Sequence, residues 1–267
     1  MKLKIYFRLL RLQLIGLFII PIASFAGIQV QNGLTHTHSG IAGNVMTGKI
    51  RVKNLSKNEE RILVYKQDLS LSCSSAVEYS ELGNNTRSSG NWIQTNIDEK
   101  LMAAGEEYDI LYTITIPNSA DLSGTYWNII MVEGADPVKE DDKEGVKISS
   151  RVRYAVQMIV DVGTFQSPQL AFENFVYQKN QAGNQTIHVL LANKGDYASK
   201  TKLTLEVYGA NGEKLKVIES QAKRLYPKKC NDFDLELKGL PVGKYDGIVV
   251  ADNGKELFGA NITISIQ

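Results

Sequence analysis

The chain has 267 residues, of which 43% are hydrophobic, 30 are basic and 29 are acidic, and its formal net charge is +1. With only two cysteines, this composition excludes collagen-like, low-complexity and disulfide-rich proteins. It also argues against a polytopic membrane protein or a basic protein that neutralises nucleic acid, so we expect no nucleic-acid partner. The length suits one large domain or two small ones.

Residues 1–26 have the three parts of an export signal. Four basic residues precede an apolar stretch over 12–22, and Ser24-Phe25-Ala26 places small residues at the two positions that a signal peptidase reads. We therefore expect cleavage after Ala26 and a periplasmic or secreted mature chain. Loss of four basic residues would change the net charge from +1 to −3. An uncleaved anchor is the alternative, but the apolar stretch is short for a membrane span of about 20 residues. We expect no integral membrane segment in the mature chain.

Alternation of apolar and polar residues dominates the rest of the chain and indicates β-strands. Turn signals such as Asn211-Gly212 and Asn253-Gly254 separate the alternating segments. The sequence contains no convincing amphipathic helix after residue 26, so the pattern predicts an all-β protein made of antiparallel β-sandwiches. The expected strands cover 45–54, 61–71, 108–116, 125–133, 169–177, 185–193, 201–208, 213–220, 231–238, 244–251 and 257–266.

The two halves of the chain share the same residues at corresponding strand ends and strand starts. A strand ends at Asn54 and a later one opens at Gly124-Thr125-Tyr126, just as one ends at Asn193 and another opens at Gly243-Lys244-Tyr245. The Asn-to-Gly separation is 70 residues in the first half and 50 in the second, and the extra residues fall in the polar stretch 72–91. This predicts two immunoglobulin-like sandwiches in tandem, over 27–162 and 163–267, with a long loop inserted in the first and a junction near Gly163.

One alternating segment is unusually long. From Val146 to Val162 the even positions are almost all apolar, over 17 residues. At about 3.3 Å per residue the segment would extend over roughly 55 Å, whereas a typical strand has about 5 to 6 residues. One sandwich cannot cover such a stripe, so the excess would bridge the domains or pair with another chain. A strand that starts late and crosses the linker is the alternative. The acidic stretch Glu140–Glu144 precedes it.

Two such sandwiches after an export signal, the first ending in a long alternating strand, resemble the periplasmic pilus chaperones, which lend that strand to an incomplete subunit. The resemblance implies that Val146, Ile148 and Val152 bind a pilin-like partner. It also implies that Arg151 or Arg153 binds the terminal carboxylate of that partner.

The sequence departs from that family at its first strand, which normally supplies a second cation. Residues 28–39 contain no Lys or Arg, so His36 and His38 are the only candidates there. A second resemblance covers both halves, because the segments 115–127 and 205–245 are similar to the two domains of the WxL-interacting surface proteins. That family is normally anchored by a C-terminal apolar helix, whereas this sequence ends in an expected strand, which suggests a relative without the anchor.

Few residues are candidates for chemistry. His36 and His38 would share one face of a strand and, with His188, would offer three metal ligands. Because no Cys or carboxylate accompanies them at ligand spacing, we expect no metal and no cofactor. Cys73 and Cys230 would pair in an oxidising compartment or remain two independent thiols. No nucleophile and base pair is evident, so we do not expect an enzyme.

The sequence therefore leaves two functions for a protein that binds other proteins. The first is a chaperone-like factor that assembles fimbrial subunits through an immunoglobulin-like strand edge. The alternative is a secreted adhesion module of the cell surface or cell wall.

Overall fold

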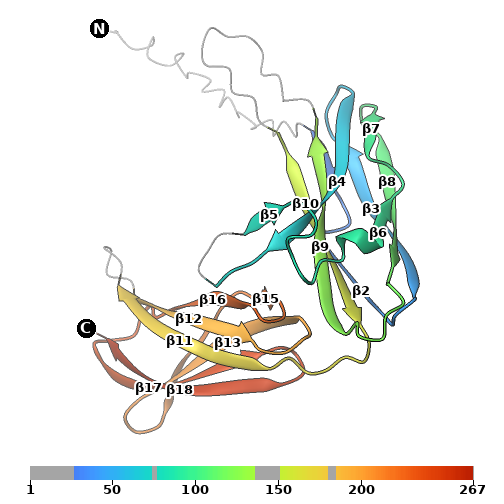
Figure 1. Cartoon of the computed structure of the whole chain (residues 1–267). Helices are drawn as coiled ribbons and strands as arrows, with labels where there is room; N and C mark the ends of the chain where they lie inside the picture. Colours follow the sequence, from blue (N-terminus) through green and yellow to red (C-terminus); the bar gives the residue numbers. More distant parts are fainter. Residues whose placement is uncertain (1–26, 74–76, 136–150, 180–184, 267) are drawn as a thin grey trace, which may run out of the picture.

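The computed structural model describes residues 27–73, 77–135, 151–179 and 185–266 (Figure 1). The expected export signal over residues 1–26, the acidic stretch Glu140–Glu144, and the candidate partner-binding residues Val146 and Ile148 lie outside these ranges. Within them, regular structure consists of strands and one short 3₁₀ helix, Gly90–Trp92. The prediction of an all-β protein is confirmed.

The first domain is a sandwich of two sheets. One sheet has the strand order β1 (Ile28–Val30), β3 (Val45–Asn54), β8 (Glu107–Thr115), β6 (Ile93–Thr95). The other has the order β2 (Thr35–Gly40), β10 (Arg153–Val162), β9 (Gly124–Gly134), β4 (Glu60–Ser70), β5 (Glu78–Ser80), and β7 (Glu99–Met102) also pairs with β4. The first strand of the domain is thus divided, because β1 lies in one sheet and β2 in the other.

The core of the first domain lies between these sheets. The even positions of β10 from Val156 to Val162 are fully buried there with residues of the opposite sheet such as Ile50 and Ile110. The C-terminal part of the long apolar stripe is therefore ordinary core. Only the part before Val156 remains as a candidate for a partner.

The second domain is a smaller sandwich with a core of its own. One sheet has the order β11 (Leu170–Lys179), β12 (Gln185–Asn193), β16 (Cys230–Glu236). The other has the order β14 (Lys214–Glu219), β13 (Ser199–Tyr208), β17 (Gly243–Asp252), β18 (Leu257–Ile266), and β15 (Lys223–Leu225) pairs with β13. Residues 163–169 connect the two sandwiches.

The repeated asparagines have the same role in both domains. The Oδ1 atom of Asn54 accepts a hydrogen bond from the backbone N–H two residues later (2.9 Å), and its Nδ2 donates to the carbonyl four residues later (2.8 Å). Asn193 makes the equivalent pair of bonds, at 2.9 and 2.7 Å. Both side chains are fully buried. Each asparagine therefore supplies hydrogen bonds to a turn that would otherwise leave buried backbone groups unpaired.

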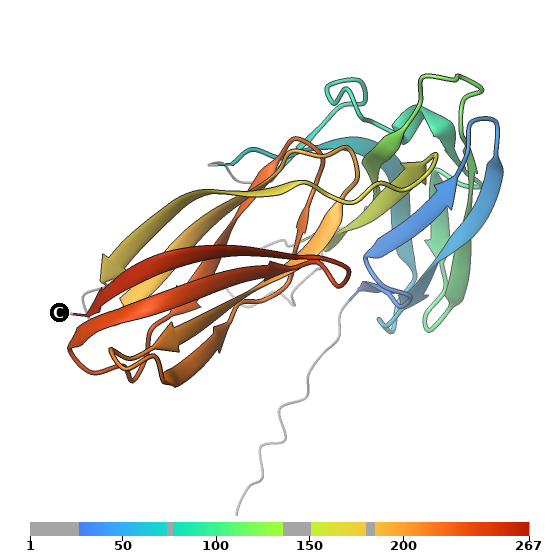
Figure 2. The ribbon, with the colours of Figure 1, turned by 90° about the horizontal axis from the view of Figure 1, so that it is seen from below.

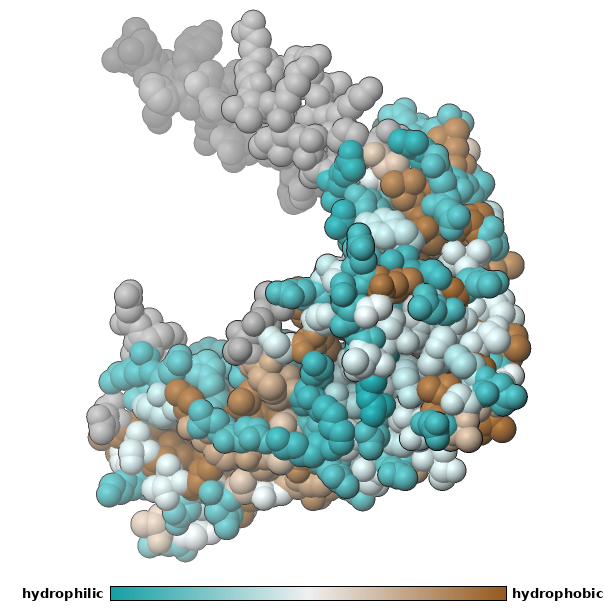
Figure 3. All heavy atoms as spheres, viewed as in Figure 1, coloured by the Kyte–Doolittle hydropathy of each residue, from teal (hydrophilic) through white to brown (hydrophobic). Residues whose placement is uncertain are grey.

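The two domains meet at an angle (Figure 1) and enclose a hollow on one side (Figure 3). An apolar cluster joins them, in which Tyr226 of the second domain packs against Trp127 with 4.6 Å between the ring centroids. A hydrogen bond from the backbone N–H of Thr125 to the carbonyl of Asp196 (2.8 Å) and an ion pair between Arg87 and Asp196 (2.6 Å) border it.

A disulfide between Cys73 and Cys230 also links the domains. It resolves the two alternatives left by the sequence in favour of pairing. Figure 2 shows the second domain from below, with its two sheets and the junction to the first domain. Among the described residues, no helix is long and apolar enough to cross a membrane.

Candidate functional site: the free edge of strand β10

Strand β10 has neighbours of unequal length on its two sides. Strand β9 pairs with all of it, from Arg153 opposite Glu133 to Val162 opposite Gly124. Strand β2 runs parallel to it and pairs only from Gln157 onward. That ladder starts with a 2.9 Å hydrogen bond from the N–H of Gln157 to the carbonyl of Leu34. Before Gln157, no strand among the described residues pairs with this edge of β10.

The direction of the backbone groups follows from the two ladders. The carbonyl of Val152 accepts a hydrogen bond from the N–H of Gly134 in β9 (3.1 Å), whereas the N–H of Gln157 points toward β2. Backbone groups alternate between the two sides of a strand, so even residues of β10 bond to β9. The N–H and C=O groups of Arg153 and Ala155 therefore point toward the free edge. Such groups are a template for pairing with another extended chain.

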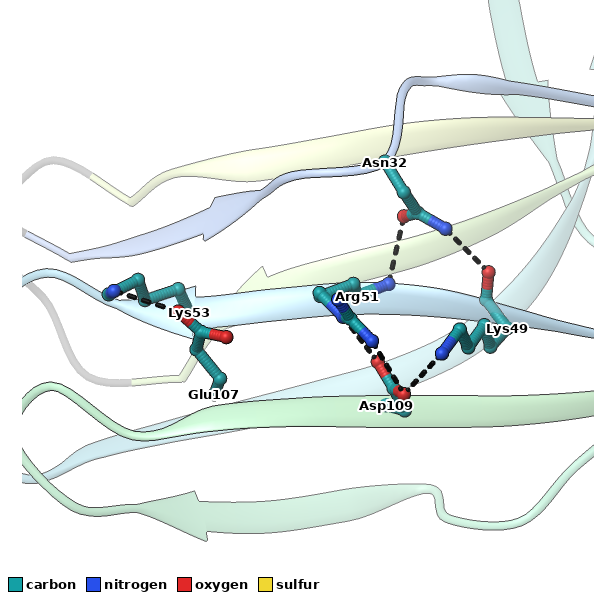
Figure 4. Close-up of polar contacts among 6 residues, drawn as sticks. All are labelled: Asn32, Lys49, Arg51, Lys53, Glu107 and Asp109. Carbon is teal, nitrogen blue, oxygen red and sulfur yellow. Dashed lines mark hydrogen bonds and ion pairs between the residues drawn. The ribbon is translucent and has the colours of Figure 1, made fainter.

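Asn32 fixes the place where β2 begins. Its Nδ2 donates to the carbonyl of Lys49 (2.7 Å) and its Oδ1 accepts from the N–H of Arg51 (2.8 Å), as Figure 4 shows. The side chain thereby continues the β1–β3 ladder by one step, and Gly33 then turns the chain toward the other sheet with a φ of +89°. Because the crossing occurs here, β2 cannot cover Arg153 to Val156.

Ion pairs cross the neighbouring strands β3 and β8 on the outer face of their sheet (Figure 4). Asp109 contacts both Lys49 and Arg51 at 2.8 Å, and Lys53 contacts Glu107 at 2.8 Å. The hydrogen bonds from Arg51 and Lys49 hold the pKa of Asp109 well below its usual range. Exposed pairs of this kind contribute little to stability, but they keep the outer face of this sheet polar.

Of the three expected partner-binding residues, the structure describes only Val152. Its side chain is 36% exposed. Tyr154 follows on the same face of the strand and is half-buried against the core of the first domain. The free edge thus carries an apolar side chain next to backbone groups with which no described strand pairs.

The structure shows that the two expected carboxylate-binding arginines already have an acidic partner. Arg153 contacts Glu133 on β9 at 2.9 Å, and Arg151 lies 3.8 Å from the same carboxylate. The Glu133 side chain is only 7% exposed and also accepts a 2.6 Å hydrogen bond from the hydroxyl of Tyr65. The bonds from Arg153 and Tyr65 lower the pKa of Glu133. Glu133 therefore stays ionised and holds Arg153 in place.

The histidine motif has a different environment from the one that a metal site needs. His36 and His38 both face the hydroxyl of Tyr112, whereas His188 lies in the second domain and contacts Asp234 at 2.6 Å. No group of three potential metal ligands occurs in the part of the chain that the structure describes. The structure brings two of the three histidines together, around a tyrosine.

Sequence reasoning missed Tyr112, Glu133 and Asn32. The sequence did contain a signal for Glu133, because this residue is an acidic side chain at the end of an apolar strand, but the signal was not used. Tyr112 and Asn32 carried none, because their roles depend on strands distant in sequence.

Among known proteins, this chain is similar to several solved structures. No family model and no curated protein matches the sequence. The class 5 fimbriae chaperone CfaA is 13% identical with a TM-score of 0.47, and the match covers 89% of this chain and 98% of that one. The chaperone YadV is 12% identical with a TM-score of 0.46, covering 89% and 100%. The E. coli chaperone DraB is 11% identical with a TM-score of 0.42, covering 89% and 99%.

All three structural neighbours are chaperones, and CfaA is a fimbriae chaperone, the class that the sequence resembles. At such identities and TM-scores, their activity does not transfer to this chain. Its function has to be inferred from its own residues.

Proposed function

We propose that this chain is a non-enzymatic, exported assembly factor that binds protein subunits by pairing their strands with the free edge of β10. One observation carries this proposal. The backbone groups of Arg153 and Ala155 point away from β9, at positions of β10 that come before its pairing with β2 starts. An incoming strand would make the hydrogen bonds that β2 makes further along β10.

The side chains of the same edge support binding of a partially apolar strand. Val152 is 36% exposed, and Val146 and Ile148 would extend its stripe in the sequence. Each such side chain left in water forgoes about 1.5–3 kcal/mol of burial. A partner that covers the stripe would recover this free energy and protect an aggregation-prone edge.

Arg151 is the better candidate for a partner's carboxylate. It is 56% exposed and lies 3.8 Å from Glu133, so it can leave Glu133 at low cost. Arg153 forms a hydrogen bond to Glu133. Its role would instead be to hold the start of β10 in place against β9.

Export is supported by the disulfide between Cys73 and Cys230. Disulfides form and persist in oxidising compartments such as the periplasm or the extracellular space. The proposed location is therefore the periplasm or the cell exterior.

The proposal is tested by replacing Val146, Ile148 and Val152 with Ser in the exported protein and identifying what co-purifies with it. The matched control is Val176→Ser, because Val176 lies on the edge strand β11 and is 40% exposed. We expect the triple variant to lose its protein partners without a change in melting temperature, and the control to keep them.

Two results would contradict the proposal. Undiminished capture by the triple variant would show that the stripe does not bind partners. A large loss of melting stability would show that its side chains are core residues. Binding to isolated cell walls, with no soluble partner, would favour the surface adhesion module.

A further inference from the structure

Two imidazoles converge on one hydroxyl inside the first domain. The Nδ1 atom of His36 and the Nε2 atom of His38 each lie 2.9 Å from the hydroxyl oxygen of Tyr112. The histidines belong to β2 and the tyrosine to β8 of the opposite sheet. Gly48 makes room for the ring, since a Cβ atom there would lie 2.3 Å from it. The cluster therefore ties β2 across the sandwich.

The number of protons in this cluster is limited. The Tyr112 hydroxyl has one proton, so it donates to one imidazole and accepts a hydrogen bond from the other. The Nε2 atom of His36 is buried and has no hydrogen-bond partner among the residues that the structure describes. It is best left as a bare lone pair, because a buried N–H without an acceptor is costly. We therefore assign the proton of His36 to Nδ1, which donates to Tyr112, and Tyr112 donates to Nε2 of His38.

Protonation disrupts this arrangement. A proton added to His36 goes to Nε2, which has no acceptor among the described residues. A proton added to His38 removes the acceptor of the tyrosine hydroxyl. Two cations would then also face each other across one oxygen.

The surroundings offer no compensating charge. Among the described residues, the titratable groups that face each imidazole are the other imidazole and Tyr112. Strand β10 places Met158 opposite His36 and Val160 opposite His38, and strand β3 contributes Met46 and Gly48 to the inner face. The acidic residue of this part of β10, Asp161, lies on the other face, where it accepts a hydrogen bond from Thr125.

The pKa directions agree with a neutral cluster. Burial lowers the pKa of His36 by more than a hydrogen bond with the backbone of Gly33 raises it, and burial together with His36 lowers the pKa of His38. Burial raises the pKa of Tyr112 to about 12.

We propose that protonation of His36 and His38 releases β2 from β10 and so extends the free edge of β10 from Val156 to Val162. That the longer edge binds partners better rests on the proposed function, whereas the release of β2 does not. A lowered histidine pKa means that the stabilisation is present above the unfolded pKa near 6.5 and is lost as the pH falls below it. Mild acid would therefore open the edge.

Hydrogen exchange of the mature protein without any partner tests the release. Exchange rates between pH 7.5 and 5, divided by the intrinsic rates at each pH, are compared for residues 34–40 and 157–162 and for the β8 reference, 107–115. We expect protection of the first two segments to fall by about tenfold per pH unit for each proton bound on opening, while β8 stays protected. Equal protection at both pH values would overturn the proposal.

Variants separate this effect from general acid destabilisation. The double variant His36→Gln, His38→Gln keeps side chains that bond to a hydroxyl but do not titrate, so its protection should not depend on pH in this range. Acid-dependent loss in this variant would overturn the proposal. Tyr112→Phe removes the shared hydroxyl, and it should leave 34–40 weakly protected already at pH 7.5. Protection equal to that of the parent protein would likewise overturn it. These readouts are independent of partner binding, so failure of the proposed function would be seen separately.

Discussion

Arg153 lies directly opposite Glu133 in the ladder between β10 and β9, with its Nε 3.0 Å and its Nη2 2.9 Å from the same carboxylate oxygen. The pair sits where the free edge of β10 begins. It holds a largely buried acid in its ionised state and keeps the side chain of the first edge residue in place.

Replacing Arg153 with Ala should therefore destabilise the first domain. The change removes one partner from a Glu133 side chain that is only 7% exposed, and an under-satisfied buried acceptor costs about 1–3 kcal/mol. Arg151→Ala is the matched control, because Arg151 is 3.8 Å away and 56% exposed, and such a pair contributes about 0–1 kcal/mol. Urea unfolding at pH 7 measures both. Equal losses for the two variants would contradict the assigned difference.

The disulfide gives a second prediction. It joins residues 157 positions apart in different domains. Removing it therefore raises the conformational entropy of the unfolded chain and removes a covalent link at the domain junction. The variant Cys73→Ser, Cys230→Ser should lose about 2–4 kcal/mol of unfolding free energy, measured by denaturation without reductant. Thiol titration of the denatured, unreduced parent protein should find no free thiol. Two free thiols in that assay would contradict the pairing.

The third prediction concerns the crossing between sheets. Asn32→Ala removes the acceptor of the Arg51 N–H and the donor to the carbonyl of Lys49. Each lost bond should cost about 0.5–1.5 kcal/mol, and the amide of Arg51 should exchange faster by NMR. Asn32→Asp keeps the acceptor, so it should preserve protection of that amide. Slow exchange at Arg51 in the Ala variant would show that Asn32 does not fix the crossing.

A fourth prediction tests the loop inserted in the first domain. Asp68 is fully buried and accepts hydrogen bonds from the N–H groups of Gly83 (2.8 Å) and Asn85 (3.0 Å) and from the hydroxyl of Ser88. Asp68→Asn replaces one acceptor oxygen with a donor, so the loop should open and trypsin should cleave faster after Arg87. The exposed Glu81→Gln in the same loop should leave cleavage unchanged. Equal cleavage of the Asp68 variant and the parent protein would contradict this anchoring role.

Features of the fold that depend on local sequence could be predicted. The strand expected over 45–54 coincides with β3, and the one expected over 61–71 is shifted by one residue from β4. The strand ends at Asn54 and Asn193 could be predicted because each asparagine forms hydrogen bonds within its own turn, no more than four residues away. Alternation and turn chemistry act over the same short range.

Features that depend on register between distant strands could not be predicted. The contact of Glu133 with Tyr65 joins residues 68 positions apart, and that of His36 with Tyr112 joins residues 76 apart. No local pattern encodes such pairs. The short strands β5, β6, β7 and β15 were missed for a related reason, because segments of three or four residues carry too little alternation to be recognised. The first strand expected over 28–39 is divided into β1 and β2, a break that also depends on pairing with distant strands.

The most direct measurement of the central claim is amide exchange along β10, residue by residue, with and without a co-purified protein subunit. In the free protein, Arg153 and Ala155 should exchange fast, while Tyr154 and Val156 should exchange slowly because they bond to β9. Saturation with the subunit should slow Arg153 and Ala155 and leave their neighbours unchanged. If Arg153 and Ala155 exchange equally fast with the subunit bound, strand pairing at this edge is contradicted.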